Sequence, residues 1–356
     1  MDAVTYGQRP PTVVELFAGA GGAALGLEAA GFSHLACIEN DADACATLRA
    51  VGLPCVEGDV RDPDLYESEW VGCDLLWASF PCQAWSSAGK REGAKDERNG
   101  WPWTVDAIDR LKPQWFAAEN VTGLLTHRSG CRAMCLGRDE CPQAYFDLVI
   151  LTQLQERYPV VQYRVLNASS FGVPQHRRRV IILAGPRAIE WPKVTHGNPT
   201  GQCELFSQPP LPWATPDYWP TPSPTVSAVG ECKGSGPGGN PQKMQRASDA
   251  LYLATGRRRL TIEECALLQD FPADHPFQGV KSSRYRQVGN AVPPALAEAV
   301  GRQLYTATKT SSGHSPRVRQ QDQVVTQLDS PTAPPQAPLS HHREQPSPRV
   351  ALQPSS

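Results

Sequence analysis

The amino-acid sequence predicts an α/β fold, built on a doubly wound and mostly parallel sheet, with a small loop-rich second domain. Three observations lead to this prediction. In the first half of the chain, short apolar and β-branched runs alternate with helical patterns, as in folds whose parallel strands are joined by crossover helices. A glycine-rich turn joins the first strand pattern to the first helical pattern. After residue 186 the alternation ends, and proline, glycine and threonine become frequent.

The elements of the sheet domain follow one another along the chain. Thr12–Phe17 contains β-branched and apolar residues typical of a strand, and residues 21–30 are rich in alanine and leucine, as is typical of a helix. The run at 73–79 is apolar enough for a buried parallel strand. Further strands are predicted at 34–39, 114–119, 160–166 and 179–183, and further helices at 41–50, 104–111 and 145–157.

The rest of the chain differs from the predicted sheet domain, which covers residues 11–185. Residues 186–257 are expected to form a loop-built region. Helical patterns return at 261–268 and 294–305, within a third segment that covers residues 258–307. Residues 308–356 are rich in proline, serine and glutamine, and we expect them to form a disordered tail.

Composition limits the class of protein. The chain has 356 residues, 40% of them hydrophobic, which is enough for one large domain or two smaller ones. The sequence shows no long apolar span and no signal-peptide pattern, so we expect a soluble cytoplasmic protein. A formal net charge of −2 excludes a global basic field, so contacts with nucleic acid must come from local patches. The 11 cysteines favour reduced thiols over a disulfide framework.

Residues at the ends of successive strand patterns favour a site for an adenosine-like group. The turn Phe17–Gly22 lets a ligand approach a helix N-terminus, although its glycine spacing departs from the dinucleotide fingerprint. Glu39 ends the second strand pattern, where an acidic residue can bind ribose hydroxyls. Asp59 lies in the next strand-end loop and can accept a hydrogen bond from the exocyclic amine of adenine. Taken singly, each acid can equally be a solvated loop residue.

A second set of residues favours nucleophilic and acid–base chemistry. Cys82 follows the pattern at 73–79, where a loop thiol can be a nucleophile, although most isolated cysteines are core residues. Glu119 closes an apolar run, and partial desolvation of its carboxylate suits acid–base work. Arg177 and Arg179 share one face of a strand and suit an electron-rich ligand. The alternative for Glu119 is an acid that caps a helix or forms an ion pair. The alternative for the two arginines is a solvated basic edge of the sheet.

Taken in order, these motifs resemble those of the cytosine-C5 DNA methyltransferase family over roughly residues 11–306. The resembling segments are Glu15–Gly22, Phe80–Gln83 with Ser86–Gly89, Glu119–Val121, the Gln-x-Arg-x-Arg run from Gln175 to Arg179, Arg259–Pro272 and Gln287–Pro294. The resemblance implies a Rossmann-like methyltransferase. Residues 11–185 would hold the catalytic and cofactor sites, and 186–257 would form the target-recognition region. Residues 258–307 would organise that region and return to the catalytic domain.

The resemblance implies that the chain is a DNA (cytosine-5-)-methyltransferase with S-adenosyl-L-methionine as its cofactor. Cys82 would add to carbon 6 of a flipped cytosine, and Glu119 would donate to ring N3. Arg177 would help to hold the base, and Arg179 would position Cys82 or Glu119. The segment Ser86–Asn99 would close over the flipped base. The cofactor would be bound by Phe17, Ala18, Gly19, Gly21, Gly22, Glu39, Asn40, Asp59, Val60, Pro81, Asn290 and Val292.

The resemblance also implies partners and a setting. We expect double-stranded DNA as the partner, a monomer on DNA, and a prokaryotic or phage modification enzyme in the cytoplasm, associated with the nucleoid. A cognate restriction endonuclease acting on the same site is a further expectation. An RNA (tRNA) cytosine-C5 methyltransferase stays open as an alternative because the recognition segment is short. A nicotinamide-dependent oxidoreductase is an alternative of another class, but it leaves Cys82 and the paired arginines unexplained.

A loose cluster of metal-ligand residue types follows the acid motif. It consists of His127, Cys131, Cys135 and Cys141. We expect no metal as the main assignment and keep structural zinc at these residues as an alternative, with surface thiols as the plainer interpretation.

Overall fold

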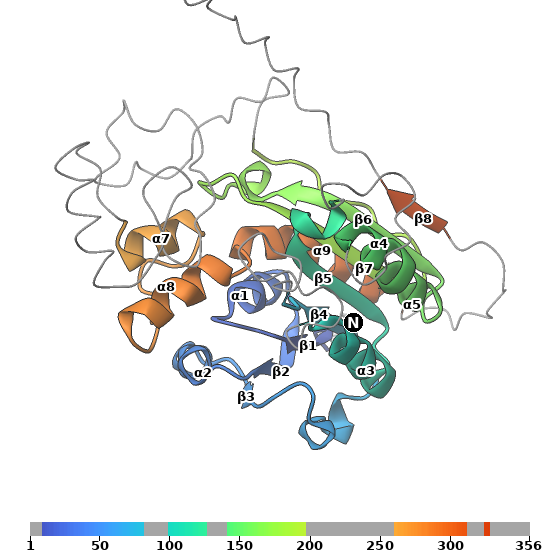
Figure 1. The fold of residues 1–356 in the computed structure, drawn as a ribbon, viewed down its shortest axis with the longest axis horizontal. Coiled ribbons are helices and arrows are strands. Elements are labelled where there is room, and N and C mark those ends of the chain that lie inside the picture. The colour runs from blue at the N-terminus through green and yellow to red at the C-terminus, as the bar shows by residue number, and fades with distance from the viewer. Residues whose placement is uncertain (1–8, 82–98, 127–140, 197–259, 312–323, 328–356) are drawn as a thin grey trace, which may run out of the picture.

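The computed structural model describes residues 9–81, 99–126, 141–196, 260–311 and 324–327. These residues form one eight-stranded sheet with the strand order β3-β2-β1-β4-β5-β7-β6-β8 (Figure 1). The strands are β1 (Thr12–Leu16), β2 (Ser33–Glu39), β3 (Cys55–Glu57), β4 (Leu75–Ala78), β5 (Trp115–Val121), β6 (Val160–Asn167), β7 (Arg178–Gly185) and β8 (Val324–Gln327). The α-helices are α1 (Gly22–Ala29), α2 (Ala42–Ala50), α3 (Trp101–Leu111), α4 (Pro142–Tyr145), α5 (Leu151–Gln155), α7 (Ile262–Leu268), α8 (Lys281–Asn290) and α9 (Pro294–Ser311). Short 3₁₀ turns are η1 (Pro63–Leu65), η2 (Ser68–Trp70), η4 (Thr122–Leu125) and η6 (Ala168–Phe171), and η5 (Phe146–Ile150) is a π-helical turn.

The sheet is mostly parallel, with one antiparallel strand inserted near its far edge. β3, β2, β1, β4 and β5 run parallel to one another, whereas β7 is antiparallel to both β5 and β6. From β1 the chain moves outward to β3 and then crosses back to β4 on the other side of β1. Open α/β sheets bind ligands beyond the carboxyl ends of the strands at such a reversal. The predicted fold class is confirmed.

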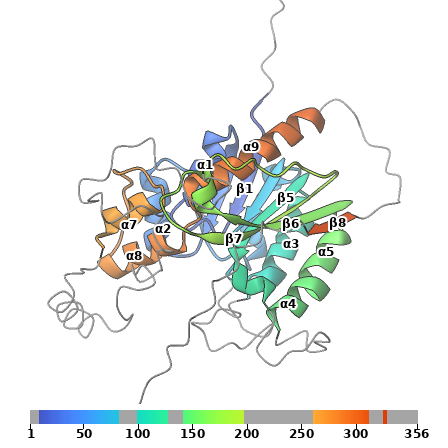
Figure 2. The same cartoon turned by 90° about the horizontal axis from the view of Figure 1, so that it is seen from above.

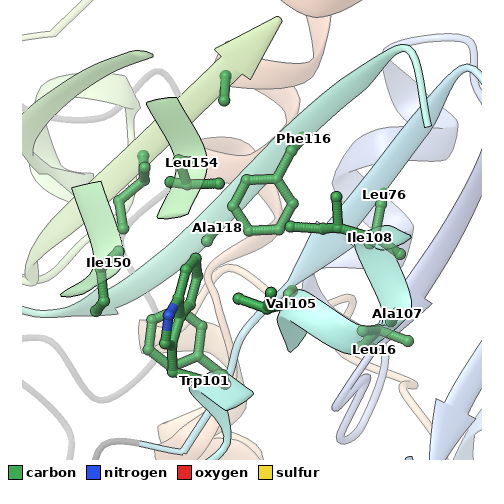
Figure 3. Packing of buried hydrophobic residues seen from close by; sticks show 14 of the residues in the cluster. Leu16, Leu76, Trp101, Val105, Ala107, Ile108, Phe116, Ala118, Ile150 and Leu154 are labelled. Atoms are coloured by element: carbon green, nitrogen blue, oxygen red, sulfur yellow. The ribbon is translucent and has the colours of Figure 1, made fainter. Parts of the chain in front are cut away.

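Helices cover both faces of the sheet (Figure 2). α1 and α9 lie on one face, where Leu27 and Val300 pack in the same core cluster as Trp77. α3 and α5 lie on the other face, where Trp101 contacts Phe116 edge to face (Figure 3). Burying each large apolar side chain stabilises the fold by about 1.5–3 kcal/mol. Among the helices that the structure describes, none has the length and apolarity to cross a membrane.

Hydrogen bonds between buried glutamine side chains join α7 and α8 to the segment just before β7. The side-chain nitrogen of Gln175 donates to Gln269 Oε1 at 2.6 Å and to the carbonyl of Leu268 at 2.7 Å. Gln269 in turn donates from Nε2 to the carbonyl of Val288 at 2.6 Å. Gln175 and Gln269 are fully buried, so losing one amide would leave its partner desolvated and unsatisfied. This network fixes the start of β7 against the end of α8.

The structure differs from the expected elements at several points. β3 and α8 were not expected, and the helix predicted at 145–157 begins at Pro142 and contains the π-helical turn. The expected disordered tail is structured where it is described. α9 continues to Ser311 because Ala307 still packs in the core, and β8 pairs with β6, whose edge would otherwise stay unpaired. The start of the expected recognition region, around Trp191, also packs into the core of the sheet.

Candidate active site

A cavity of about 630 Å³ opens beyond the carboxyl ends of β1, β2, β4 and β5. It is lined by side chains from both sequence-predicted sets, the adenosine set and the arginine–acid set. Of the predicted cofactor residues, Phe17, Ala18, Gly19, Glu39, Asn40, Asp59, Val60, Pro81, Asn290 and Val292 line it. Glu119, Arg177 and Arg179 line it as well. The topology therefore brings the two sets together in one site.

The conformation of the turn after β1 is fixed by two residues with left-handed backbone angles and by hydrogen bonds to Glu39. Phe17 has φ 57° and Gly19 has φ 56°, and the first of these is unusual for a residue with a side chain. The amide of Gly19 donates to Glu39 Oε2 at 2.8 Å. Glu39 Oε1 accepts from the amides of Asn40 and Asp41, each at 2.9 Å. The carboxylate at the end of β2 therefore shapes the cavity wall as well as facing it.

Gly21 and Gly22 allow the backbone conformation of the turn and its close packing against a distant segment. Gly21 takes φ 83° at the N-cap of α1, a conformation that side chains disfavour. A Cβ on Gly22 would lie 2.2 Å from the carbonyl oxygen of Val292. Gly22 therefore lets α1 approach the Asn290–Val292 segment, which returns from α8 to the cavity.

Asp59 reaches the cavity already paired with a neighbouring cation. Its Oδ1 accepts from the amide and from Nε of Arg61, both at 2.9 Å, and its Oδ2 lies 2.5 Å from Nη2 of the same guanidinium. These hydrogen bonds lower the pKa of the Asp59 carboxyl, so it is ionised at neutral pH. Arg61 also lines the cavity and was not predicted. The sequence does place Arg61 two residues after Asp59, and this spacing could have indicated the ion pair.

Glu119 and Arg179 form an ion pair across two antiparallel strands. Glu119 is opposite Ile181 in the β5–β7 register and Arg179 is opposite Val121, so the two residues are diagonal neighbours on one face. Arg179 Nε lies 2.7 Å from Glu119 Oε1, and both side chains are nearly buried. The predicted strand-end acid is thus brought against one of the predicted arginines.

Arg177 is turned toward backbone carbonyls. Its Nη2 donates to the carbonyls of Gly289 at 2.9 Å and Ala291 at 2.8 Å. Burial lowers the pKa of this guanidinium well below its ordinary value, and the charge of Arg179 acts in the same direction. Arg177, the residue before β7, therefore ties the start of this strand to the end of α8 and the residues after it, which supply Asn290 and Val292 to the cavity wall.

Cys82 lies outside the described residues, as do His127, Cys131, Cys135 and the segment 82–98. The chain before Cys82 is described to Pro81, and the carbonyl of Phe80 accepts from Asn120 Nδ2 at 3.1 Å. This hydrogen bond, which the sequence did not predict, joins the residue after Glu119 to the segment that leads to Cys82. Cys141, the described member of the predicted zinc cluster, is buried next to the start of α4.

Other lining residues have no sequence signal of their own. Arg286 on α8 donates to Asp41 Oδ2 at 2.6 Å, which closes one side of the cavity between α8 and α2. Trp103 on α3 is 37% exposed and lines the cavity with its apolar ring. Arg286 and Asp41 are separated by 245 positions, so no local pattern indicates their contact.

Comparison with known proteins identifies the family. The model of the family described as "C-5 cytosine-specific DNA methylase" matches residues 11–204 and 216–306. The chain belongs to this family. It is 35% identical over 322 residues to the Type II methyltransferase M.NaeI of Lentzea aerocolonigenes, covering 83% of this chain and 75% of that protein. It is also 35% identical over 324 residues to the Type II methyltransferase M.NgoMIV of Neisseria gonorrhoeae, covering 84% and 98%.

Solved structures show the same fold at lower identity. The S. pombe Dnmt2 methyltransferase matches with a TM-score of 0.55 and 17% identity, covering 85% of this chain and 99% of that one. A Spodoptera frugiperda DNMT2 mutant matches with a TM-score of 0.52 and 17% identity, covering 83% and 99%.

The methylase acts on cytosine in DNA, with S-adenosyl-L-methionine as the methyl donor. The nicotinamide alternative is therefore wrong. The cavity suits the donor: its volume is that of a small-molecule site, Phe17, Val60 and Val292 offer apolar walls for a purine, and Glu39 and Asp59 offer acceptors for hydroxyl and amine groups.

Proposed function

We propose that Cys82 is the nucleophile of this methylase and that it adds to carbon 6 of a flipped cytosine. Carbon 5 of cytosine is a poor nucleophile, and addition of a thiolate at carbon 6 converts the ring to an enamine that is nucleophilic at carbon 5. The observation that carries the proposal is the hydrogen bond from Asn120 to the carbonyl of Phe80. It joins β5, the strand that carries Glu119, to the segment that leads into Cys82, at the wall of the cavity.

Glu119 acts on the ring nitrogen as the thiolate attacks. Its carboxyl group, at the end of a buried strand, donates to N3 and holds the exocyclic amine of cytosine. Arg179 positions this carboxyl group through their ion pair. Arg177 supports the base pocket from behind by holding the carbonyls of Gly289 and Ala291.

The donor is held by the turn after β1 and by the strand-end acids. S-adenosyl-L-methionine supplies an electrophilic methyl group when it is bound. Phe17, Ala18 and Gly19 would line its site, Glu39 would accept from its ribose, and Asp59 would accept from its adenine amine. Pro81 and Asn290 would complete the wall of this site, since both line the cavity. Gly21 and Gly22 act indirectly, by allowing the turn and its packing.

The substrate is double-stranded DNA, from which the target cytosine is flipped. Stacking covers carbon 6 inside a duplex, so extrusion of the base precedes the attack, at about a few kcal/mol. The methylase acts as a monomer in a bacterial or phage modification system, paired with an endonuclease of the same site. The names of M.NaeI and M.NgoMIV as Type II methyltransferases support this setting. Its place of action is the cytoplasm, at the nucleoid.

The Cys82→Ser variant tests the nucleophile. We expect methyl transfer to duplex DNA to fall below detection, while the Kd for S-adenosyl-L-methionine stays within about twofold because the thiol is not part of the donor site. Cys73→Ser, which changes a buried core cysteine, is the matched control and should keep its activity. Full activity of Cys82→Ser would overturn the assignment. The same assay with transfer RNA in place of duplex DNA separates the RNA alternative, which predicts the reverse preference.

A further inference from the structure

A buried group of three metal-ligand side chains lies in the sheet beneath the cofactor cavity. Glu15 comes from β1, and His34 and Cys37 come from β2. One ligand atom of each residue, a carboxylate oxygen, an imidazole nitrogen and a thiol sulfur, lies within 4.8 Å of the other two. The side chains of Glu15 and His34 are 1% and 0% exposed, and Cys37 is 0% exposed. The methyl-transfer chemistry described above uses none of these side chains.

A break in the strand register brings the three residues to one face. Val13 pairs with His34 and Val14 pairs with Ala36, so β2 has one extra residue, Leu35, at this point. Without this bulge, His34 and Cys37 would point to opposite faces, since side chains alternate along a strand. Bulges of this kind re-aim side chains. Here the bulge places His34 on the same face as the Glu15–Cys37 pair.

The polar atoms in this group lack the hydrogen bonds that buried polar atoms normally make. Glu15 Oε2 and both ring nitrogens of His34 are buried, and none has a hydrogen-bond partner among the described residues. His34 Nε2 lies 3.4 Å from Glu15 Oε2. A charge-assisted hydrogen bond is shorter, about 2.7–2.9 Å. Two ligands of a tetrahedral zinc ion, each about 2.0–2.1 Å from the metal, lie roughly 3.3 Å apart, which matches the observed separation.

The other side of the imidazole faces a second carboxylate. His34 Nδ1 lies 3.9 Å from Glu28 Oε1, at the end of α1. Histidine ligands of metal ions commonly offer one ring nitrogen to the metal and the other to a carboxylate, which sets the tautomer and the ring orientation. Glu28, His34 and Glu15 are arranged in this order, with Glu28 at ion-pair distance from Nδ1 rather than at hydrogen-bond distance.

We propose that Glu15, His34 and Cys37 bind a zinc ion that fastens β1 to β2 beneath the cofactor cavity. Carboxylate oxygen, imidazole nitrogen and thiolate sulfur are each ligands that zinc accepts, and a carboxylate and a thiolate together balance its charge. The Cys37 thiol gives up its proton to solvent on binding, because the thiolate is the ligand. A water molecule completes the coordination as the fourth ligand.

Metal titration of the full-length protein tests the proposal. Chelator-treated protein should bind one Co²⁺ ion with the absorption bands of a thiolate-bound tetrahedral ion, and Zn²⁺ should displace it. Cys37→Ser should remove the thiolate band and weaken Zn²⁺ binding by more than about 100-fold, since changes in second-shell partners alone cost about 10–100-fold. Cys73→Ser, another buried cysteine, is the matched control and should keep both.

The outcome does not depend on methyl transfer. If Cys37→Ser or His34→Gln does not fold, Glu28→Gln serves instead, because the Glu28 side chain is half exposed. The proposal expects it to keep the thiolate band and to bind Zn²⁺ about 10–100-fold more weakly. Binding that survives Cys37→Ser but is lost in Cys141→Ser would place the ion elsewhere and overturn the proposal. Absence of Co²⁺ binding would also overturn the proposal. The group would then be explained by an ion pair between Glu15 and His34.

Discussion

Arg179 Nε lies 2.7 Å from Glu119 Oε1, across the antiparallel pairing of β7 with β5. The contact exists because β7 enters the sheet in the direction opposite to its neighbours, which brings its first residues beside the carboxyl end of β5. In a fully parallel sheet the carboxyl end of a neighbouring strand would be there instead. The antiparallel direction of β7 thus delivers Arg179, and Arg177 just before the strand, to the ligand-binding edge.

This ion pair predicts a graded loss of activity. Glu119→Gln should lower kcat by about 10²–10⁴-fold, because the proton donor is lost. Arg179→Ala should lower it by about 10²-fold through a misplaced carboxyl group, and Arg179→Lys by less. The double variant should be no worse than Glu119→Gln alone, since both changes act through one group. Single-turnover methylation of duplex DNA measures these rates.

The matched control for this series is Arg178→Ala. Arg178 is exposed and adjacent in sequence, so kcat at saturating DNA should stay near the wild-type value. Additive effects of the Glu119 and Arg179 changes would contradict the positioning role.

Arg61 is expected to compete with the cofactor for Asp59. Both carboxylate oxygens of Asp59 already accept from Arg61, so an adenine amine must displace part of this pair. Arg61→Ala should therefore lower the Kd for S-adenosyl-L-methionine about two- to fivefold, the scale of an exposed ion pair. Asp59→Asn should raise it about tenfold or more, because a charged acceptor is lost. Isothermal titration calorimetry measures both, and weaker binding by Arg61→Ala would rule out the competition.

Gly22 is expected to be intolerant of a side chain. A Cβ there would lie 2.2 Å from a backbone oxygen of Val292, which cannot move without shifting the segment after α8. Gly22→Ala should lower the free energy of unfolding by about 1–3 kcal/mol, measured by urea denaturation. Gly123→Ala is the control, because its Cβ would meet Val121 at 3.6 Å, an ordinary contact. Equal stability of the two variants would show that this close approach can relax.

His275 predicts a pH dependence of stability. Burial lowers the pKa of His275 to about 4, and its Nε2 lies 3.2 Å from the carbonyl oxygen of Ala20 in the cofactor turn. Because the pKa is higher in the unfolded chain, about 6.5, the unfolded state binds more protons between the two values. The stability that neutral His275 contributes is complete above about pH 6.5 and is lost as the pH falls toward 4.

The measurement is the free energy of unfolding in urea between pH 7 and pH 4.5. His275→Gln should flatten the dependence by at most one proton, which is about 1.4 kcal/mol per pH unit. Identical slopes for the variant and the wild type would mean that His275 is not held neutral by burial.

Much of the fold could be predicted from local patterns. The strands β1, β2, β4 and β5 are short apolar runs with clear boundaries, and their order along the chain is enough to place Glu39 and Glu119 at the same edge of a parallel sheet. β3 was missed because it has three residues, and α8 because its sequence is polar, with Tyr285 and Val288 as its buried apolar side chains.

The sequence by itself determined which residue types stand at the strand ends, because side-chain alternation and strand boundaries are local properties. The tertiary structure decided what each of them contacts. Arg177 donates to the carbonyls of Gly289 and Ala291, more than 110 positions away, and the bulge in β2 turns His34 toward Glu15. Such contacts depend on strand register and on loop closure between distant segments, and these are set by the packing of the whole sheet rather than by any local stretch of sequence.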